Sequence, residues 1–241
     1  MIAHSNPTAL ITGASRGLGL ALARALSERG WALILDARGH EALEAARTSF
    51  VPQAPVYTLA GDVTDPEHRE ALATIAHRAG GLDALINNAS ALGPSPMPAL
   101  LDFPLAALET VFRTNVVAPL ALIQTLREDL KPGARIINIT SDAGVEAYEG
   151  WGGYGSSKAA LEHVSAILAA ELPSYRVYWV DPGDMRTQMH QDAFPGEDIS
   201  DRPLPEVSVP GFLTLLTGDL PSGRYKAQAI PAQDHALSGQ R

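Results

Sequence analysis

The sequence predicts an α/β fold: a doubly wound, seven-stranded and mostly parallel sheet with helices on both faces. Two observations support this prediction. Short apolar runs alternate along the chain with longer segments of helical period, and the apolar runs are almost continuously hydrophobic. Alternating strands and helices indicate βαβ units, and continuously apolar strands indicate a sheet that is buried on both faces. Right-handed crossovers then wind the chain in both directions from the centre of the sheet.

The expected elements follow one another without an obvious linker. Seven strands are expected, over Thr8–Thr12, Ala32–Leu35, Val56–Leu59, Ala84–Asn87, Arg135–Ile139, Arg176–Val180 and Arg224–Gln228. Six helices are expected between them, over Gly17–Arg29, Glu41–Phe50, Pro66–Ala79, Pro104–Leu130, Gly155–Glu171 and Pro205–Leu216. The chain contains no internal repeat or low-complexity run, so residues 1–241 are expected to form one domain.

Two connections are long for a compact α/β protein. They are Ser90–Pro104, after the fourth strand, and Asp184–Pro205, after the sixth. Long loops at the carboxyl ends of strands commonly carry substrate contacts, so these two segments are expected to shape a binding site.

Composition excludes several classes of function. The net charge of −9 and pI of about 5.2 argue against a nucleic-acid or anionic-membrane partner, because phosphate binding requires a basic surface. There is no cysteine, and the seven histidines lack metal-ligand spacing, so no metal site is expected. No run of 18 apolar residues and no basic start before a hydrophobic block is present. We therefore expect no membrane span and no signal peptide, and a cytoplasmic location.

A glycine-rich segment, "TGASRGLG" (Thr12 to Gly19), lies between the first expected strand and helix. In a doubly wound fold this turn places the pyrophosphate of a dinucleotide against helix N-terminal amides. Gly13 would permit the tight turn, and Gly17 and Gly19 would leave room for the phosphate. A flexible loop before a helix is the alternative.

The end of the second strand, "LILDARGHEAL", bears on the choice of cofactor. Asp36 is a candidate for binding the ribose hydroxyls of NAD(H). Because Asp36 and Ala37 point in opposite directions along a strand, Ala37 is the other residue that can face the ribose. Arg38, with Arg16 from the glycine turn, could then bind a 2′-phosphate by planar bidentate bonds. This arrangement favours NADP(H). The alternative is that both arginines are surface residues and Asp36 binds NAD(H).

Tyr154 and Lys158 are four residues apart at the start of a helix, so they share one helix face. Ser141 comes just after the fifth expected strand, at the same edge of the sheet. Reduction of a carbonyl needs a hydride and a proton. A phenol near an ammonium group could supply the proton, because the ammonium lowers the phenol pKa, and a serine hydroxyl could orient the carbonyl oxygen. The alternatives are a capping serine, a helix-start aromatic and a solvated lysine.

In these motifs the chain resembles the short-chain dehydrogenase/reductase family, over roughly residues 8 to 230. The matching pieces are "TGASRGLG", "GDV" (Gly61–Val63), "NNA" (Asn87–Ala89), Asn115, Ser141, "YGSSK" and "DPGDMRT" (Asp181–Thr187). The resemblance implies a Rossmann-type, NAD(P)-binding domain and a catalytic set of Asn115, Ser141, Tyr154 and Lys158. It implies a cofactor site formed by Gly13, Ser15, Arg16, Gly17, Leu18, Gly19, Arg38, Asp62, Val63, Asn88, Tyr154, Lys158, Pro182, Gly183 and Thr187.

The resemblance also assigns roles to individual residues. Asp62 and Val63 would bracket the adenine, and Asn88 would lie by the adenosine ribose. Asn115, in mid-helix, would hold a water that links Lys158 to bulk solvent. The nicotinamide side would be lined by residues that follow the sixth strand, Pro182, Gly183 and Thr187.

Two features depart from the family pattern. Ser90 stands where the family often has glycine after "NNA", so the loop after the fourth strand is expected to run differently. The stretch Asp142–Gly153 is acidic and aromatic, and its Tyr148 and Trp151 either wall the substrate pocket or pack on the sheet edge. Within the family, "INNASALG", "EGWGGYGSSKAA", "YRVYWVDPGDMRTQM" and "SGRY" resemble the sepiapterin and benzil reductase branch, which reduces ketones next to a second carbonyl with NADPH.

The sequence therefore predicts an NADPH-dependent carbonyl reductase or alcohol dehydrogenase that acts on a small ketone or diketone. An NAD-dependent alcohol dehydrogenase and a non-catalytic dinucleotide-binding regulatory protein are the alternatives. The helices expected over Pro104–Leu130 and Gly155–Glu171 carry more apolar surface than one sheet face covers, which predicts a homodimer or homotetramer. Ordinary exposed apolar area would account for the same surplus.

Overall fold

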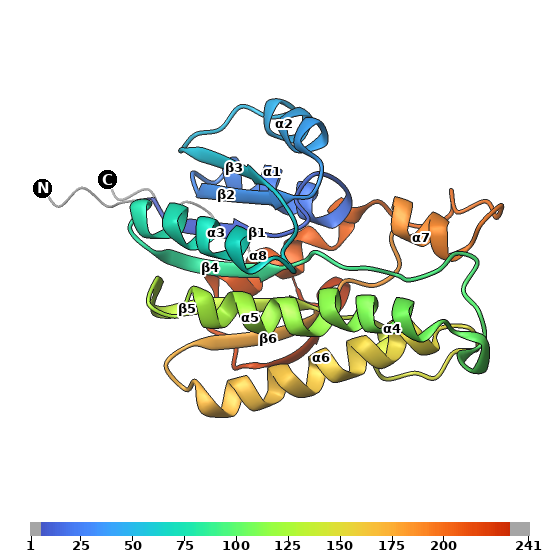
Figure 1. Ribbon diagram of the computed structural model, residues 1–241. Coiled ribbons are helices and arrows are strands. Elements are labelled where there is room, and N and C mark those ends of the chain that lie inside the picture. The colour runs from blue at the N-terminus through green and yellow to red at the C-terminus, as the bar shows by residue number, and fades with distance from the viewer. Residues whose placement is uncertain (1–5, 232–241) are drawn as a thin grey trace, which may run out of the picture.

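The computed structural model describes residues 6–231, which contain one seven-stranded sheet in the order β3-β2-β1-β4-β5-β6-β7 (Figure 1). Every neighbouring pair of strands in this sheet is parallel. The strands are β1 Thr8–Ile11, β2 Ala32–Ala37, β3 Val56–Ala60, β4 Leu82–Asn87, β5 Leu130–Ile139, β6 Arg176–Asp181 and β7 Gly223–Lys226. The predicted doubly wound α/β fold is confirmed.

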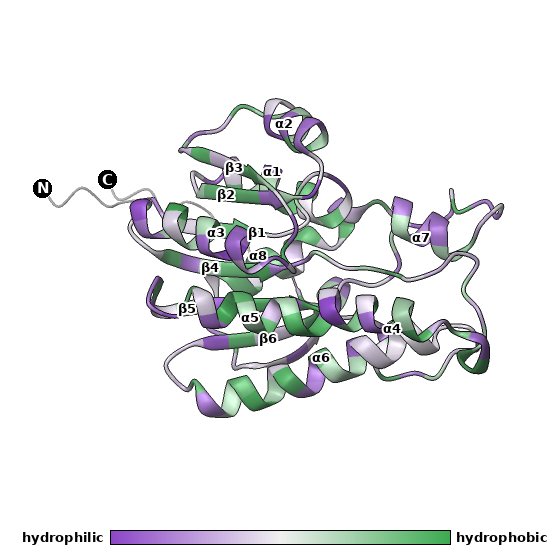
Figure 2. Ribbon diagram, in the orientation of Figure 1, coloured by the Kyte–Doolittle hydropathy of each residue, from purple (hydrophilic) through white to green (hydrophobic). Residues whose placement is uncertain are grey.

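Helices cover both faces of the sheet and close two apolar cores. One face packs against α1 (Gly17–Ser27), α2 (His40–Thr48) and α8 (Val209–Thr217). The other packs against α3 (Pro66–Arg78), α5 (Ala118–Thr125) and α6 (Gly152–Glu171). Figure 2 shows largely hydrophobic colouring along the central strands that these helices cover. Burial on both faces explains why the strands read as apolar runs rather than alternating ones.

The strand order reverses at β1, which pairs with β2 on one side and β4 on the other. Ile11 of β1 is opposite Leu35 of β2 and Ile86 of β4. The carboxyl ends of these three strands therefore lie at one edge of the sheet. In open parallel sheets this reversal point is where ligands bind.

The helix expected over Pro104–Leu130 is different in the structure. It consists of α4 (Leu105–Phe112), a wide π-helical turn (Arg113–Val117) and α5, and the chain has already entered β5 at Leu130. Leu130 pairs with Leu82, but a bulge follows before the next pair. The stretch "LKPG" hides this early strand from the sequence pattern, because Pro132 and Gly133 (φ +78°) interrupt the apolar run.

The expected loop Asp184–Pro205 contains a short helix, α7 (Gln188–Ala193), whose first turn is capped by the side chain of Thr187. Short 3₁₀ turns occur at Leu100–Asp102, Asp142–Gly144, Pro205–Val207 and Ala227–Ala229. The remaining differences from the predicted elements are shifts of a few residues at their ends.

The continuous helical segment Leu105–Thr125 is, within residues 6–231, long and apolar enough to cross a membrane by length and composition. Polar residues interrupt its apolar run, so the sequence pattern predicts no membrane span there. About 33% of its most apolar stretch is buried inside the protein. The core helix of a compact protein meets the same criterion, so this feature alone assigns no membrane contact.

Candidate active site

The glycine turn between β1 and α1 is built to bring backbone close to a ligand. Gly13 (φ +65°) and Gly17 (φ +54°) adopt left-handed conformations that favour glycine. A Cβ on Gly19 would clash with the carbonyl oxygen of Gly13 and lie 2.7 Å from Nδ2 of Asn88. The first turn of α1 has no acidic residue, and its N-cap residue Arg16 makes no side-chain capping bond. Unclaimed N–H groups and a positive helix end fit an anion such as a pyrophosphate.

Thr12 and Asn88 hold this turn against the end of β4. The Thr12 hydroxyl accepts hydrogen bonds from the N–H groups of Asn88 and Ala89, each at 3.0 Å. The Asn88 side chain donates to the carbonyl oxygens of Thr12 (2.9 Å) and Gly13 (3.1 Å). Asn88 thus shapes the turn itself, and its place beside an adenosine ribose stays a prediction.

The structure distinguishes between the acidic and basic residues at the end of β2. Asp36 is buried, and its Oδ1 lies 2.6 Å from Nε2 of His68 on α3. Burial raises the pKa of Asp36, although His68 opposes the shift. Arg38 and Arg16 are exposed, and neither guanidinium group forms a hydrogen bond or ion pair with another residue between 6 and 231. The carboxylate is therefore engaged inside the protein, whereas both guanidinium groups remain available at the surface.

Asp62 and Val63 lie in the turn after β3, at the same edge of the sheet. Asp62 is exposed and accepts a hydrogen bond from the N–H of Thr64 at 2.8 Å, whereas Val63 is buried. Desolvation would raise the pKa of Asp62, but the hydrogen bonds from Thr64 and the nearby charge of Arg38 lower it below its usual value. Asp62 is charged and Val63 is apolar. Together they could contact the polar edge and the apolar face of an adenine base.

The structure brings Ser141, Tyr154 and Lys158 together. Tyr154 and Lys158 are both buried in the first turns of α6, and Nζ of Lys158 lies 5.4 Å from the centre of the Tyr154 ring. Nζ also donates a hydrogen bond to the carbonyl oxygen of Ile139, the last residue of β5, at 2.8 Å. The hydroxyls of Ser141 and Ser90 face the Tyr154 phenol.

The protonation of this group differs from the sequence expectation. Burial raises the pKa of Tyr154 above its ordinary value of 10, with the nearby charges of Asp142 and Asp181 adding to the rise. The hydroxyls of Ser90 and Ser141 oppose it. Burial also lowers the pKa of Lys158 to about 7. The expected lowering of the phenol pKa by the lysine is thus wrong for the protein alone, because the same desolvation disfavours both charges.

Asn115 lies in the π-helical turn, with its side chain buried and fully hydrogen-bonded. Its Nδ2 donates to the carbonyl oxygen of Ala91 and to Oγ of Ser157, both at 2.9 Å. Its Oδ1 accepts from the N–H of Ala91 at 2.7 Å and from Oγ of Ser90 at 3.1 Å. The side chain therefore joins the loop after β4 to α6 and has no capacity left for a water.

Ser141 acts as a cap as well as a site residue. It precedes the 3₁₀ turn Asp142–Gly144, accepts a bond from the N–H of Ala143 at 3.2 Å, and donates its hydroxyl proton to Oδ1 of Asp142 at 2.8 Å. Behind it, Arg224 of β7 pairs with Glu162 of α6 at 3.0 Å and donates to the Ser141 carbonyl oxygen at 3.3 Å. The capping alternative and the site assignment are thus compatible.

Aromatic side chains cover Tyr154. The ring of Trp151 lies 5.8 Å from the rings of both Tyr154 and Phe194, and 6.4 Å from that of Tyr148. Tyr148 in turn donates its hydroxyl to Oδ2 of Asp142 at 3.1 Å. Of the two alternatives, the structure supports Trp151 as a wall beside Tyr154 rather than packing at the sheet edge.

The two long connections also touch each other above the site. The hydroxyl of Ser95, in the connection after β4, donates to the carbonyl oxygen of Asp192 in α7 at 2.6 Å. Leu92 from the first connection and Ala193 from the second share an apolar cluster with Tyr154. Both connections therefore contribute to the surroundings of the phenol, as their lengths predicted.

The segment after β6 connects this region to the glycine turn. Gly183 (φ +77°) donates its N–H to Asp181 at 2.9 Å, and the carbonyl oxygen of Pro182 accepts from Ser208 at 2.7 Å. The Thr187 methyl lies 3.5 Å from where a Cβ on Gly17 would stand. Thr187 thus lies beside the first turn of α1, and Pro182 and Gly183 are fixed by Ser208 and Asp181.

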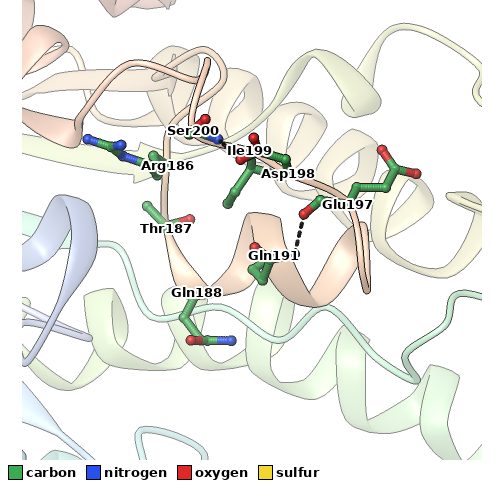
Figure 3. Close-up of a pocket in the computed structure, with 8 residues that line it drawn as sticks. All are labelled: Arg186, Thr187, Gln188, Gln191, Glu197, Asp198, Ile199 and Ser200. Atoms are coloured by element: carbon green, nitrogen blue, oxygen red, sulfur yellow. Dashed lines mark hydrogen bonds between the residues drawn. The ribbon is translucent and has the colours of Figure 1, made fainter.

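A cavity of about 390 Å³ lies against α7 and the segment after it (Figure 3). Its lining residues are Arg186, Thr187, Gln188, Gln191, Glu197, Asp198, Ile199 and Ser200. The cavity adjoins the glycine turn through Thr187 but does not include Tyr154, which is buried. Its size alone therefore does not locate the chemistry; the side-chain constellation is the better guide.

Three residues with a bearing on the site were not predicted. Ser90 was noted only as a departure from glycine, Asp142 only as part of an acidic stretch, and His68 not at all. A serine next to "NNA" and an acid directly after Ser141 were the available signals. Nothing local marks His68, because its partner Asp36 is 32 residues away. No cluster of metal-ligating side chains occurs in the described range, and His4 and His235 lie outside it.

Residues 7–198 match the family described as short chain dehydrogenase. The chain belongs to the short-chain dehydrogenase/reductase family. Among its relatives is a benzil reductase ((S)-benzoin forming) from Saccharomyces cerevisiae, 34% identical over 193 residues, covering 76% of this chain and 73% of that protein. A serine 3-dehydrogenase from Agrobacterium fabrum is 36% identical over 188 residues, covering 75% and 73%.

Solved structures of the family share the fold. A short chain dehydrogenase from Pseudomonas syringae has a TM-score of 0.84 at 30% identity, over 92% of this chain and 94% of that one. A short chain dehydrogenase from Shigella flexneri complexed with NADP has a TM-score of 0.82 at 28% identity, over 93% and 98%. The chain is an NAD(P)-dependent oxidoreductase acting on carbonyl or alcohol groups.

The depressed pKa of Lys158 predicts a pH-dependent stability. Between pH 7 and 10.5 the unfolded lysine keeps a proton that the folded lysine has lost, so stability rises with pH in this window. Compared with Lys158→Met, wild type should gain about 2 kcal/mol in free energy of unfolding from pH 7 to 9, measured by urea denaturation. Lys226→Met, at an exposed lysine, is the control. A difference between wild type and Lys158→Met that is constant over this range would contradict the assignment.

Proposed function

We propose that the protein is an NADPH-dependent carbonyl reductase, or alcohol dehydrogenase in the reverse direction, for a small ketone or diketone. The observation that carries the proposal is the meeting of Ser141, Tyr154 and Lys158 at the end of β5, at the same sheet edge as the glycine turn. A protein that only bound a dinucleotide would have no chemical need for these three side chains together.

The residues at the reversal point fit a nicotinamide dinucleotide. The glycine turn and the N-terminus of α1 would hold the pyrophosphate, Asp62 and Val63 would flank the adenine, and the exposed Arg16 and Arg38 would bind a 2′-phosphate. When bound, the cofactor supplies or accepts the hydride. The burial of Asp36 against His68 supports NADPH over NADH, because the carboxylate that would bind ribose hydroxyls is already engaged.

Ser141 and Tyr154 would act on the substrate oxygen. The Ser141 hydroxyl donates a hydrogen bond to Asp142 in this structure. To orient a carbonyl, the hydroxyl must therefore turn from Asp142 toward the substrate. A raised pKa keeps Tyr154 as a neutral phenol, which is the form that can donate a proton to the developing alkoxide. The phenolate left behind would be stabilised by a protonated Lys158, and by the Ser90 hydroxyl once it turns from Oδ1 of Asn115.

The phenol must then be reprotonated, and Lys158 is the nearest group that can exchange a proton. A pKa of about 7 lets its amine gain and lose a proton near neutrality. The Asn115 side chain is saturated, so a water that links Lys158 to solvent would have to be held by other groups.

The apolar side chains around Tyr154 support an apolar substrate. Trp151, Phe194 and Leu92 surround the phenol with hydrocarbon, whereas Asp142 places a negative charge next to Ser141. Such surroundings favour a neutral, apolar carbonyl compound over a carboxylate or phosphate ester. The relative that acts as a benzil reductase supports an aryl diketone as the first compound to test.

Tyr154→Phe tests the proton donor. The variant keeps the aromatic packing but loses the hydroxyl, so turnover of a ketone and diketone panel with NADPH should fall by about 10² to 10⁴-fold. NADPH binding, measured by fluorescence titration, should stay near that of wild type. Tyr148→Phe, which removes a more exposed hydroxyl of the same pocket, should cost far less. Equal rates for Tyr154→Phe and wild type would remove Tyr154 from the mechanism.

Arg38→Ala tests the cofactor preference. Loss of a guanidinium that binds a 2′-phosphate should raise the dissociation constant for NADPH by about tenfold or more and leave that for NADH nearly unchanged. Arg29→Ala, at an exposed arginine whose side chain bonds only to its own helix, is the matched control. An undiminished NADPH preference in Arg38→Ala would refute this pocket and favour an NAD-dependent enzyme.

We also propose that two or four copies assemble through the α4–α5 and α6 surface. Leu105, Val117 and Ile167 are 74%, 56% and 45% exposed there. Val117→Asp should lower the mass measured by light scattering from a multiple of 25.5 kDa toward one chain, because it places a charge in the apolar contact. Val51→Asp, at a valine that is 89% exposed and lies outside this surface, should leave the mass unchanged. A monomeric wild type would refute the assembly.

A further inference from the structure

A buried acid–base pair lies beneath the cofactor site and has no part in the chemistry proposed above. Oδ1 of Asp36 and Nε2 of His68 are 2.6 Å apart, and their side chains are 1% and 8% exposed. Two titratable side chains that are removed from water so completely are unusual unless they serve one another. The burial of this pair therefore indicates a specific function for it.

The pair lies at the point where three parts of the cofactor site meet. The main-chain carbonyl of Asp36 accepts the N–H of Ala14 in the glycine turn at 2.8 Å, and the N–H of Gly13 faces its carboxylate. The imidazole of His68 lies directly on Gly61, where any Cβ would overlap the ring. Gly61 begins the turn that carries Asp62 and Val63. The pair thus contacts both the glycine turn, proposed to hold the pyrophosphate, and the turn Gly61–Val63, proposed to flank the adenine.

The position of Asp36 makes the direction of its carboxylate important. At the end of β2, a carboxylate turned toward the cofactor would accept hydrogen bonds from the two ribose hydroxyls of NADH. The same carboxylate would repel the 2′-phosphate of NADPH and offset the attraction of Arg38. In this structure the carboxylate lies on the inner side of the strand, next to His68, and Ala37 is the last residue of β2.

We infer that His68 is a positioning residue that sets the cofactor preference, by keeping the Asp36 carboxylate out of the ribose site. Without its partner, the buried carboxylate would keep only the Gly13 N–H as a hydrogen-bond donor, which is unfavourable for a charge removed from water. Turning toward the ribose hydroxyls or toward water relieves that cost. This inference rests on the proposed NADPH site, but it concerns a residue that touches neither cofactor nor substrate.

Three variants test the inference by fluorescence titration with NADPH and NADH. The measured quantity is the ratio of the two dissociation constants, NADH over NADPH. His68→Ala should lower this ratio by about tenfold. His68→Gln, whose amide can still donate to Asp36, should keep it within about threefold of wild type. Asp36→Ser combined with His68→Ala should restore it, because the carboxylate is gone and a hydroxyl can still face Gly13.

A purely structural role for His68 gives a different pattern. Both dissociation constants would then rise in parallel, the ratio would stay constant, and removal of Asp36 would restore nothing; any of these results overturns the inference. His68→Leu, which fills the space of the imidazole without a donor, replaces His68→Ala if the latter does not fold by thermal unfolding. The wild-type ratio is judged separately: a wild type that does not prefer NADPH refutes the proposed cofactor, whereas the change from wild type to variant decides the role of His68.

Discussion

The close approach of α6 to the end of β5 determines where the reacting side chains lie. A Cβ on Gly155 would stand 2.6 Å from the carbonyl oxygen of Ala143, and one on Gly144 would stand 3.2 Å from the main chain of Lys158. Two glycines thus let the helix rest directly on the turn after the strand. Lys158 then reaches back to the carbonyl of Ile139, and Tyr154 comes to face Ser141. The three groups proposed to act on the substrate oxygen are thus attached to the two sides of this contact.

Because α6 lies so close to the turn after β5, the ionisable groups of Tyr154 and Lys158 are removed from water. A buried phenol resists losing its proton, and a buried amine resists keeping its own, so in the protein alone the pair favours the uncharged state of both. The neighbouring polar groups then determine how easily Tyr154 becomes a phenolate. The hydroxyls of Ser90 and Ser141 can stabilise a phenolate when they turn from Asn115 and Asp142, whereas the charges of Asp142 and Asp181 oppose it. The balance suits a tyrosine that gives up a proton only when a substrate oxygen is present to receive it.

Much of the fold was predictable because its signals are local. Alternating strand and helix patterns gave the order of elements, and the position of "TGASRGLG" after the first strand located the reversal point. Ser141, Tyr154 and Lys158 could be singled out because residue type, spacing and placement at one sheet edge agreed. The early start of β5 escaped detection because Pro132 and Gly133 break its pattern. The partnership of Asp36 with His68, and the protonation of Tyr154 and Lys158, depend on burial and on residues far apart in sequence, which no local pattern records.

The hydrogen bond from Ser95 to the carbonyl of Asp192 joins the two long connections over the phenol. Each connection also places an apolar residue, Leu92 or Ala193, in the cluster around Tyr154. The two segments are consequently coupled, because displacement of one strains its hydrogen bond to the other. A sequence change in one segment would therefore also alter how the other packs against Tyr154.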